Sequence, residues 1–398
     1  MKAAFVVDAL RTPVGKFAGT LSTVRPDDLA AFTLKKIATR NTWLNPSDIE
    51  EVILGAANQS GEDNRNVARM AALLAGFPVN VSGVTVNRLC ASGLQSIADA
   101  FTNVATGNGA IFIAGGVESM SRAPYVLSKA NNAFDRNQQM YDTSIGWRFT
   151  NKAFPKEITY SMGETAENVA RKWNISREAQ DAFALASQQK YQAAHAAAKF
   201  SQEIEAVEVE IGKGKSVLFD KDEHPRQTTL EDLGKLKPAF VKDGTVTAGN
   251  SSGINDGAAA LLIVSEDVVK QYQLKPLARI AAYAAAGVEA AYMGIGPVPA
   301  TQKALKRAGI SINDIGLAEL NEAFASQSLA CMQDLGINPN IVNVNGGAIA
   351  IGHPLGCSGS RISVTLLHEM QRRKEVRYGL ATMCIGVGQG MAIIFERC

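Results

Sequence analysis

The chain has 398 residues, of which 46% are hydrophobic and 20% are charged, and its formal net charge is +2. This composition excludes a disordered chain, and the near-neutral charge argues against nucleic acid or an acidic membrane surface as a partner. No apolar run in the sequence approaches the ~20 residues that a membrane-spanning helix needs.

The start of the chain and its cysteines and histidines predict a cytoplasmic protein with reduced thiols and no metal site. Asp8 and Arg11 interrupt the first apolar stretch, which a signal peptide would not allow. The five cysteines form no CxxC pair, and the four histidines form no HExxH motif. Cysteines without a secretory signal are expected to stay reduced.

In the first third of the chain, short apolar runs alternate with longer amphipathic segments. Buried strands are predicted at 3–7, 51–54, 84–87 and 110–114, and helices at 27–38, 66–74 and 91–105. In the last of these helices, Leu94, Ile97 and Phe101 recur on one helical face. This alternation predicts an α/β protein with largely parallel sheets.

Between residues 121 and 250 the alternation stops. The stretch NKAFPKEITYSMG has no strand pattern, and a long helical segment follows Ser176, which we expect to be its N-cap. A polar, irregular stretch comes next. We therefore predict a long insertion, or lid, over the core.

The last third repeats the rhythm of the first. Strands are predicted at 278–282, 316–320, 341–344 and 379–383, and helices at 300–308, 323–333 and 358–372. Three pairs of segments also match in letters and in order: 46–55 with 312–321, 84–87 with 342–345, and 109–117 with 379–387. Each match is weak, and chance similarity is the alternative to a duplicated α/β unit.

Taken as a duplication, these matches divide the chain into three regions. The N-terminal half is expected at 1–120 plus 251–274, the inserted domain at 121–250, and the C-terminal half at 275–398. Two such halves would pack against each other, and a site with residues from both halves would lie where they meet.

Four residues that could carry chemistry follow predicted strands, at the sheet edge where α/β proteins bind ligands. They are Cys90, Asn321, His353 and Cys384. Cys90 stands at a strand–helix junction, where a helix N-terminus favours the thiolate. Each residue also has a structural interpretation: packing for the two cysteines, a turn for His353, and a helix N-cap for Asn321.

Motifs spread from end to end resemble those of the thiolase family, which makes or cleaves 3-oxoacyl-CoA thioesters by Claisen chemistry. They are VDALRTPVGKFAG, VNRLCASG, GGVESMS, SMGETAENVA, TAGNSSGINDGAAA, GIGPVPA, LNEAFA, NGGAIAIGHPLGCSGSR and CIGVGQG. The resemblance implies an acyltransferase with a five-layered α-β-α-β-α fold, built from two duplicated α/β halves with an inserted loop domain.

The resemblance also implies roles for individual residues. Cys90 would be the nucleophile that carries the acyl group, and His353 would accept the proton of Cys90 and later that of CoA. Cys384 would exchange a proton with the α-carbon of acetyl-CoA. Asn321 would hold a water that stabilises the enolate oxygen together with His353. The backbone N–H groups of Cys90 and Gly386 would form a second oxyanion hole.

Coenzyme A and acetyl-CoA would be substrates, with no permanently bound cofactor. The family pattern places Arg226 near the adenine, Ser252 along the pantetheine with Ala323 and Phe324 beside it, and Met162 and Met293 around the acyl group. Core packing is the other interpretation of the two methionines. The resemblance further implies a homotetramer (a dimer of dimers) or a dimer, and a place in a β-oxidation complex.

Different motifs of the chain are similar to thiolases that act on different substrates. GHPLGCSGSRIS and LATMCIGVGQG are most similar to degradative 3-oxoacyl-CoA thiolases, so we expect thiolysis of short or medium acyl chains by a reversible ping-pong reaction. YDTSIGWRF, at 141–149, is similar to 3-oxoadipyl-CoA thiolases. Acetoacetyl-CoA-specific acetyltransferases share other motifs, but they often carry His where this chain has Ser161.

Two other classes of protein are alternatives. A carrier-protein condensing enzyme would share the duplicated core and the nucleophilic cysteine, but it would usually lack the long insertion and the Cys384 motif. A binding or scaffold protein without activity would lack a nucleophile or a base, whereas Cys90, His353 and Cys384 are all present.

Overall fold

A ten-stranded mixed sheet runs through the computed structural model, which describes residues 2–398. One part of the sheet, the N-terminal half, holds β1 (Ala4–Arg11), β3 (Glu51–Gly55), β4 (Ser82–Val86), β5 (Ile111–Ser119) and β10 (Asn255–Ser265), with the short β2 (Gly15–Lys16) paired to β10. The other part, the C-terminal half, holds β11 (Ala278–Gly287), β12 (Ile315–Leu320), β13 (Tyr378–Ile385) and β14 (Gln389–Glu396).

The two halves have the same strand order and the same strand directions. The N-terminal half runs β4-β3-β5-β10-β1, and the C-terminal half runs β12-β13-β14-β11. In each, the parallel pair (β3–β5 or β12–β13) is followed by antiparallel pairs with β10 or β14 and then with β1 or β11. The predicted duplicated α/β architecture is confirmed; the exact boundaries of the three regions stay a prediction.

The predicted parallel character of the sheet is wrong. β10 and β14 were not predicted as strands, and both run antiparallel to their neighbours in the middle of each half. The predicted elements alternate correctly, but alternation does not reveal that one further strand returns between them.

The predicted strand at 341–344 is also absent. A single bridge joins Val342 to Ala318, after a 3-10 turn at Pro339–Ile341. Asn343 has a left-handed φ of +47°, and its side-chain amide, rather than a strand, pairs with the backbone N–H and carbonyl of Leu320. At the opposite edge of the sheet, β4 is half-exposed rather than buried.

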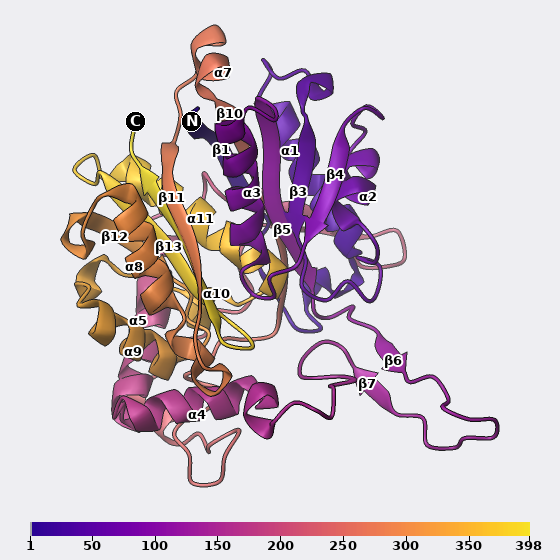
Figure 1. The fold of residues 1–398 in the computed structure, drawn as a ribbon, viewed down its shortest axis with the longest axis vertical. Helices are drawn as coiled ribbons and strands as arrows, with labels where there is room; N and C mark the ends of the chain where they lie inside the picture. The colour runs from indigo at the N-terminus through magenta and orange to yellow at the C-terminus, as the bar shows by residue number, and fades with distance from the viewer. Residues whose placement is uncertain (1) are drawn as a thin grey trace.

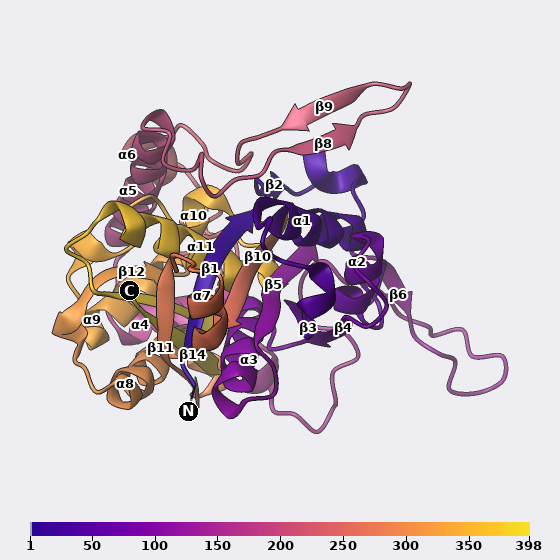
Figure 2. The same ribbon diagram turned by 90° about the horizontal axis from the view of Figure 1, so that it is seen from above.

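Helices complete five layers, as predicted. The outer face of the N-terminal half is covered by α1 (Pro26–Arg40) and α2 (Val67–Leu74), and that of the C-terminal half by α8 (Pro297–Ala308) and α9 (Ala325–Leu335). Between the two halves lie α3 (Ser92–Thr106) and α11 (Leu355–Arg372), as Figures 1 and 2 show.

The two central helices cross at glycines. A Cβ on Gly93 would lie 2.6 Å from the backbone nitrogen of Ser360, and one on Gly359 would lie 2.3 Å from that of Leu94. Only residues without a side chain allow this approach. The crossing brings the N-terminal ends of α3 and α11 together.

The region 121–250 forms an arm and a cover. The arm is the hairpin of β6 (Tyr125–Leu127) and β7 (Met140–Asp142), which extends away from the body (Figures 1 and 2). The cover contains α4 (Met162–Lys172), α5 (Arg177–Ala196), the hairpin of β8 (Val207–Glu210) and β9 (Ser216–Phe219), and α6 (Leu230–Gly234).

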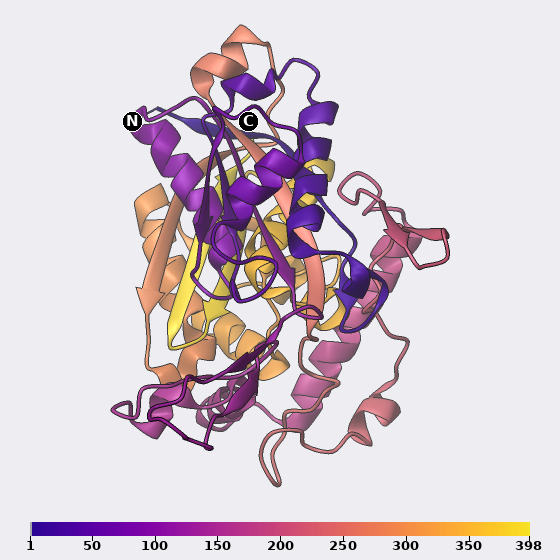
Figure 3. The same ribbon diagram turned by 90° about the vertical axis from the view of Figure 1, so that its right-hand side faces the viewer.

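Two helices of the cover lie against the C-terminal half. α4 and α5 pack against α9, and α5 also packs against α10 (Ala348–Ile351). Figure 3 shows these helices at the end opposite the short α7 (Glu266–Gln271). Ser176 caps α5 as predicted, since its hydroxyl accepts the N–H of Ala179.

Candidate active site

Cys90 lies on a tight turn between β4 and α3. Leu89 has a φ of +48°, which is uncommon for a leucine, and its N–H donates to the side chain of Asn87 at 2.8 Å. Ser92, the first residue of α3, holds the turn by donating to the carbonyl of Leu89 and accepting the N–H of Arg88. The turn thus presents the thiol at the start of the helix, where the sequence predicted it.

Burial controls the ionisation of Cys90. It raises the pKa of the thiol to about 11, although the backbone N–H groups of Gly386 and of Cys90 itself lower it. The backbone N–H groups act in the direction expected of a helix N-terminus, but burial has the larger effect on the pKa. A base must remove the proton. The two N–H groups point toward the sulfur of Cys90. When the sulfur attacks a carbonyl carbon, the oxygen of that carbonyl would lie close to the same two donors.

Cys384 and Asn321 lie on neighbouring strand ends. Cys384 is the penultimate residue of β13, two residues before Gly386. Asn321 directly follows β12 and donates its N–H to the carbonyl of Thr382. The pKa of the Cys384 thiol is raised well above its usual value by burial and next by the negative charge that Cys90 carries as a thiolate. Asn321 is not a helix N-cap, because α9 begins only at Ala325.

His353 does not follow a strand, contrary to the prediction. It lies between α10 and α11, where its N–H donates to the side chain of Asn255 at 2.9 Å. The side-chain nitrogen of Asn321 lies 3.4 Å from each ring nitrogen. Among residues 2–398, the buried Oδ1 of Asn321 has no hydrogen-bond partner. That acceptor is suited to a water or a substrate group.

Ser358 sets the tautomer of His353. Its hydroxyl lies 2.8 Å from the carbonyl oxygen of Pro354 and 2.6 Å from Nδ1 of His353. A hydroxyl has one proton, and a carbonyl can only accept, so Ser358 donates to Pro354 and accepts from Nδ1–H. The lone pair of the imidazole is then on Nε2, which is free to act as a base.

Burial also keeps His353 neutral. It lowers the pKa of the imidazole to about 3, and the charge of Arg361 acts in the same direction. At neutral pH the site thus combines a neutral imidazole with two protonated thiols. This combination can move protons between sulfur, nitrogen and carbon without a standing charge.

An apolar wall surrounds Cys384. Met293, Ala323 and Phe324 share a buried cluster with it, and Met162 packs against that cluster. These four residues are those predicted to contact the acyl group (Met162 and Met293) and the pantetheine (Ala323 and Phe324). Ser161 caps α4 with a reciprocal pair of hydrogen bonds to Glu164, which fixes Met162 at the first turn.

The remaining predicted CoA residues are tied to one loop. Ser252 donates its N–H to the carbonyl of Ala323 at 3.0 Å, beside the wall. Arg226 is exposed and donates to the carbonyl of Ala248 at 3.2 Å, at the other end of the same loop. The predicted positions thus form a continuous path from Arg226 to Cys384.

Sequence reasoning missed several residues at the site. Ser358 and Asn255, which hold His353, were within quoted motifs but gave no signal of their contacts. Glu118 is buried and accepts the N–H groups of Ala57, Asn58 and Gly356, and burial raises its pKa to about 7. Phe240 packs against Phe324 at the wall with ring centroids 6.1 Å apart.

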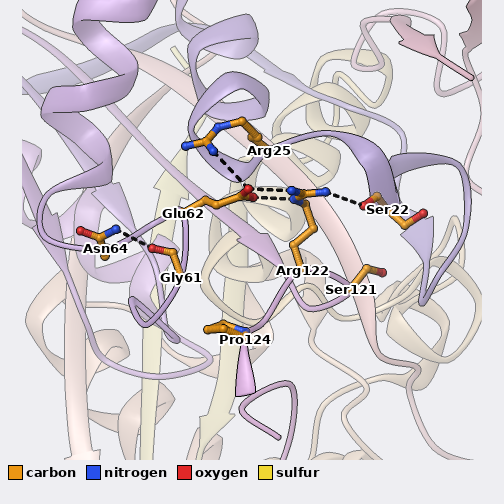
Figure 4. A pocket seen from close by; sticks show the side chains of 8 residues that line it. All are labelled: Ser22, Arg25, Gly61, Glu62, Asn64, Ser121, Arg122 and Pro124. Carbon is orange, nitrogen blue, oxygen red and sulfur yellow. Dashed lines mark hydrogen bonds and ion pairs between the residues drawn. The ribbon is translucent and has the colours of Figure 1, made fainter. Parts of the chain in front are cut away.

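A surface pocket of about 510 Å³ lies elsewhere on the N-terminal half and is not this site. Its lining includes Arg25, Glu62 and Arg122, and none of the predicted residues. Figure 4 shows Glu62 between the two arginines, so their charges are already paired.

Residues 2–398 contain no group of three or more His, Cys, Asp or Glu side chains that could hold a metal ion. No helix in the same range is both long enough and apolar enough to cross a membrane.

The sequence matches two family models along nearly its whole length. They are described as the N-terminal domain of thiolase, over residues 4–267, and the C-terminal domain of thiolase, over residues 274–397. The chain belongs to the thiolase family. Membership of this family favours a CoA-dependent acyltransferase over a carrier-protein condensing enzyme and over a scaffold protein without activity.

Known relatives and structures agree with this assignment. The thiolase is 54% identical over 401 residues to the 3-oxoadipyl-CoA/3-oxo-5,6-dehydrosuberyl-CoA thiolase of Escherichia coli K12, with 100% of each chain covered. It is 54% identical over 397 residues to the β-ketoadipyl-CoA thiolase of Pseudomonas aeruginosa, covering 99% and 98%. Its structure matches the Bacillus anthracis acetyl-CoA acetyltransferase with a TM-score of 0.94 at 41% identity, covering 100% and 99%.

Proposed function

We propose that this thiolase cleaves a 3-oxoacyl-CoA whose acyl chain ends in a carboxylate, with 3-oxoadipyl-CoA as the best substrate. The observation that carries the proposal is 54% identity, along the whole chain, to two thiolases named for this substrate. The motif YDTSIGWRF supports it as well. Short or medium unsubstituted chains, our first expectation, become the second choice.

The proposed reaction begins at Cys90. Nε2 of His353 takes the thiol proton, and the sulfur attacks the keto carbon of the substrate. The N–H groups of Cys90 and Gly386 stabilise the oxyanion that forms. The bond between C2 and C3 then breaks, so that the acyl group stays on Cys90 and acetyl-CoA leaves as its enolate.

Cys384 and Asn321 act on the leaving enolate. The thiol of Cys384 donates a proton to its carbon, while a water held by Asn321, together with His353, stabilises its oxygen. A second CoA then attacks the thioester on Cys90. The Cys90 thiolate that leaves regains its proton from His353, and the thiol proton of CoA replaces the one that Cys384 gave to acetyl-CoA. With 3-oxoadipyl-CoA the products are succinyl-CoA and acetyl-CoA.

The substrate proposal is tested by a panel of three thioesters. We expect kcat/KM for thiolysis to be highest for 3-oxoadipyl-CoA, lower for 3-oxohexanoyl-CoA, which has the same chain length without the carboxylate, and lower for acetoacetyl-CoA. An enzyme that cleaves only acetoacetyl-CoA would instead be an acetyl-CoA C-acetyltransferase.

The proposed role of Cys90 is tested by intact-mass analysis after treatment with acetyl-CoA. We expect one acetyl group on the wild-type protein and none on Cys90→Ala. Cys398→Ala removes the exposed C-terminal thiol and is the matched control, which should still be acetylated. Acetylation of Cys90→Ala would overturn the assignment.

We also propose a cytoplasmic homotetramer, a dimer of dimers. The β6–β7 arm supports self-association, because Tyr125, Phe134 and Met140 are exposed, Phe134 at 97%, on a segment that extends from the body. Light scattering of the purified protein measures the assembly. Membership of a β-oxidation complex stays a prediction, which co-purification would test.

A further inference from the structure

Arg148 is a cation without a counter-charge in the YDTSIGWRF motif. Its side chain is half-buried, between β7 and α4, in a segment that passes below the N-terminal half of the sheet (Figure 1). Nη2 donates to Oδ1 of Asn58 at 2.9 Å and lies 3.3 Å from Oγ of Ser60. Within the described chain, residues 2–398, no carboxylate forms an ion pair with Arg148, whereas Arg122 is paired with Glu62.

The contacts of Arg148 lead to the nucleophile. Asn58 follows β3 in the same loop as Ala57, whose carbonyl accepts the side chain of Asn87 at 2.9 Å. Asn87 in turn accepts the N–H of Leu89, next to Cys90. Arg148 is therefore bound to the loop that supports the Cys90 turn. Both of its hydrogen-bond partners, Asn58 and Ser60, belong to the N-terminal half.

A carboxylate near Cys90 would need a cation. Glu118 already places a carboxyl group close enough to raise the pKa of Cys90, and both Ala57 and Asn58 donate to it. A carboxylate on the substrate would be repelled by Glu118 in its ionised form unless a positive group compensated it. Arg148 donates to the same Asn58, and within residues 2–398 it forms no ion pair of its own.

The guanidinium has the geometry for this role. Its two protein contacts use one nitrogen, Nη2, so the N–H groups of Nε and Nη1 stay free to donate to a ligand, and a hydrogen bond from a charged guanidinium to a carboxylate is a strong one. We infer that Arg148 binds the terminal carboxylate of the acyl chain. This inference rests on the proposed function, because only a dicarboxylic substrate brings that group into the site.

The length of the acyl group agrees with this placement. After cleavage of 3-oxoadipyl-CoA, the group on Cys90 is a four-carbon chain. Its carboxylate is only two methylene groups beyond the thioester carbon. The residue that binds it must therefore lie near the Cys90 turn rather than along the pantetheine path marked by Ser252 and Arg226.

Arg148→Gln tests the inference, because it removes the charge and keeps a side chain that can contact Asn58. The quantity to measure is the ratio of kcat/KM for 3-oxoadipyl-CoA to that for 3-oxohexanoyl-CoA. We expect the ratio to fall by roughly 10- to 100-fold, the range produced by losing a hydrogen bond to a charged group. Arg148→Lys keeps the charge without the planar guanidinium and should restore part of the ratio.

Arg136→Gln is the matched control. Arg136 is exposed in the same inserted segment, so its loss changes the net charge equally, and the ratio should stay at the wild-type value. Circular dichroism and the unfolding temperature of each variant show that it is folded.

The outcomes separate the two proposals. A wild-type enzyme that prefers 3-oxoadipyl-CoA, with an Arg148→Gln variant that keeps this preference, would overturn the role of Arg148 alone. An equal fall for both substrates would make Arg148 structural and overturn it too. A wild-type enzyme without any preference for the carboxylate would overturn the proposed function and, with it, this inference.

Discussion

The two central helices start in the same way but deliver different chemistry. At the start of α3, Ser92 donates to the carbonyl of Leu89 at 2.6 Å and so holds the turn that carries Cys90. At the start of α11, Ser358 donates to the carbonyl of Pro354 and accepts from the ring of His353. One local device thus fixes a nucleophile in one half and a base in the other.

The halves differ in what precedes each helix. In the N-terminal half, β4 leads into the Cys90 turn after only a few residues. In the C-terminal half, the corresponding strand is reduced to the bridge at Val342, and the chain freed from the sheet forms α10 and the loop of His353. Loss of an edge strand therefore provides the loop that brings the base to the nucleophile.

The largest expected effect concerns the crossing of the two helices. Gly93→Ala and Gly359→Ala should each lower the free energy of unfolding by about 3 kcal/mol, because the new methyl group meets the backbone of the other helix. Urea titration measures the change. Gly234→Ala, which meets nothing within 4 Å, is the control and should be near neutral. If only one of the two substitutions lowered the free energy of unfolding, the similarity between the first turns of α3 and α11 would not extend to how tightly they pack.

Ser358→Ala tests whether the serine of α11 acts through His353. We expect kcat to fall by roughly 10- to 100-fold with little change in KM, because the imidazole loses the partner that fixes its tautomer. The pH profile of kcat should change as well. Ser363→Ala removes a similar bond, to the carbonyl of Gly359 inside α11, and should leave kcat and its pH profile unchanged. A variant with the wild-type pH profile would show that Ser358 is only structural.

The smallest expected effect is the contribution of the buried His353 to the pH dependence of the free energy of unfolding. Burial lowers the pKa of His353 from 6.5 to about 3, so between these values the unfolded chain binds a proton that the folded protein does not. The free energy of unfolding therefore falls as the pH falls. From pH 6.5 to 5.0 this group should account for about 1 to 2 kcal/mol.

The measurement compares two variants with the wild type at both pH values. His353→Gln should lose less stability on acidification than the wild type does, by the stated amount. His195→Gln, which replaces an exposed histidine, should lose as much as the wild type. An equal loss in all three proteins would mean that His353 is not held neutral by the fold.

Several elements could be predicted from sequence because their cause is local. The helix of α3 follows from the spacing of Leu94, Ile97 and Phe101, and the start of α5 follows from Ser176. The resemblance in motifs identified the family and named residues that the fold brings together. Their roles remain to be measured.

Other features depend on contacts between distant segments. β10 is eleven buried residues with the sequence NDGAAALLIVS, and its alanines fit a helix as well as a strand. The strand expected at 341–344 is replaced by the side chain of Asn343, which pairs with Leu320 some twenty residues away. The pKa of Cys90 could not be foreseen either, because it depends on burial as well as on its helix.

The layer formed by α3 and α11 belongs to neither half alone. Its buried residues, such as Ile97 and Ile362, share one core with Ala114 of β5 and Met383 of β13. A fragment that ended after β10 would expose the inner face of its sheet to water, and so would the remaining fragment. We therefore expect each half, produced without the other, to be unstable in water, so that the nucleophile and the base depend on the same core for their positions.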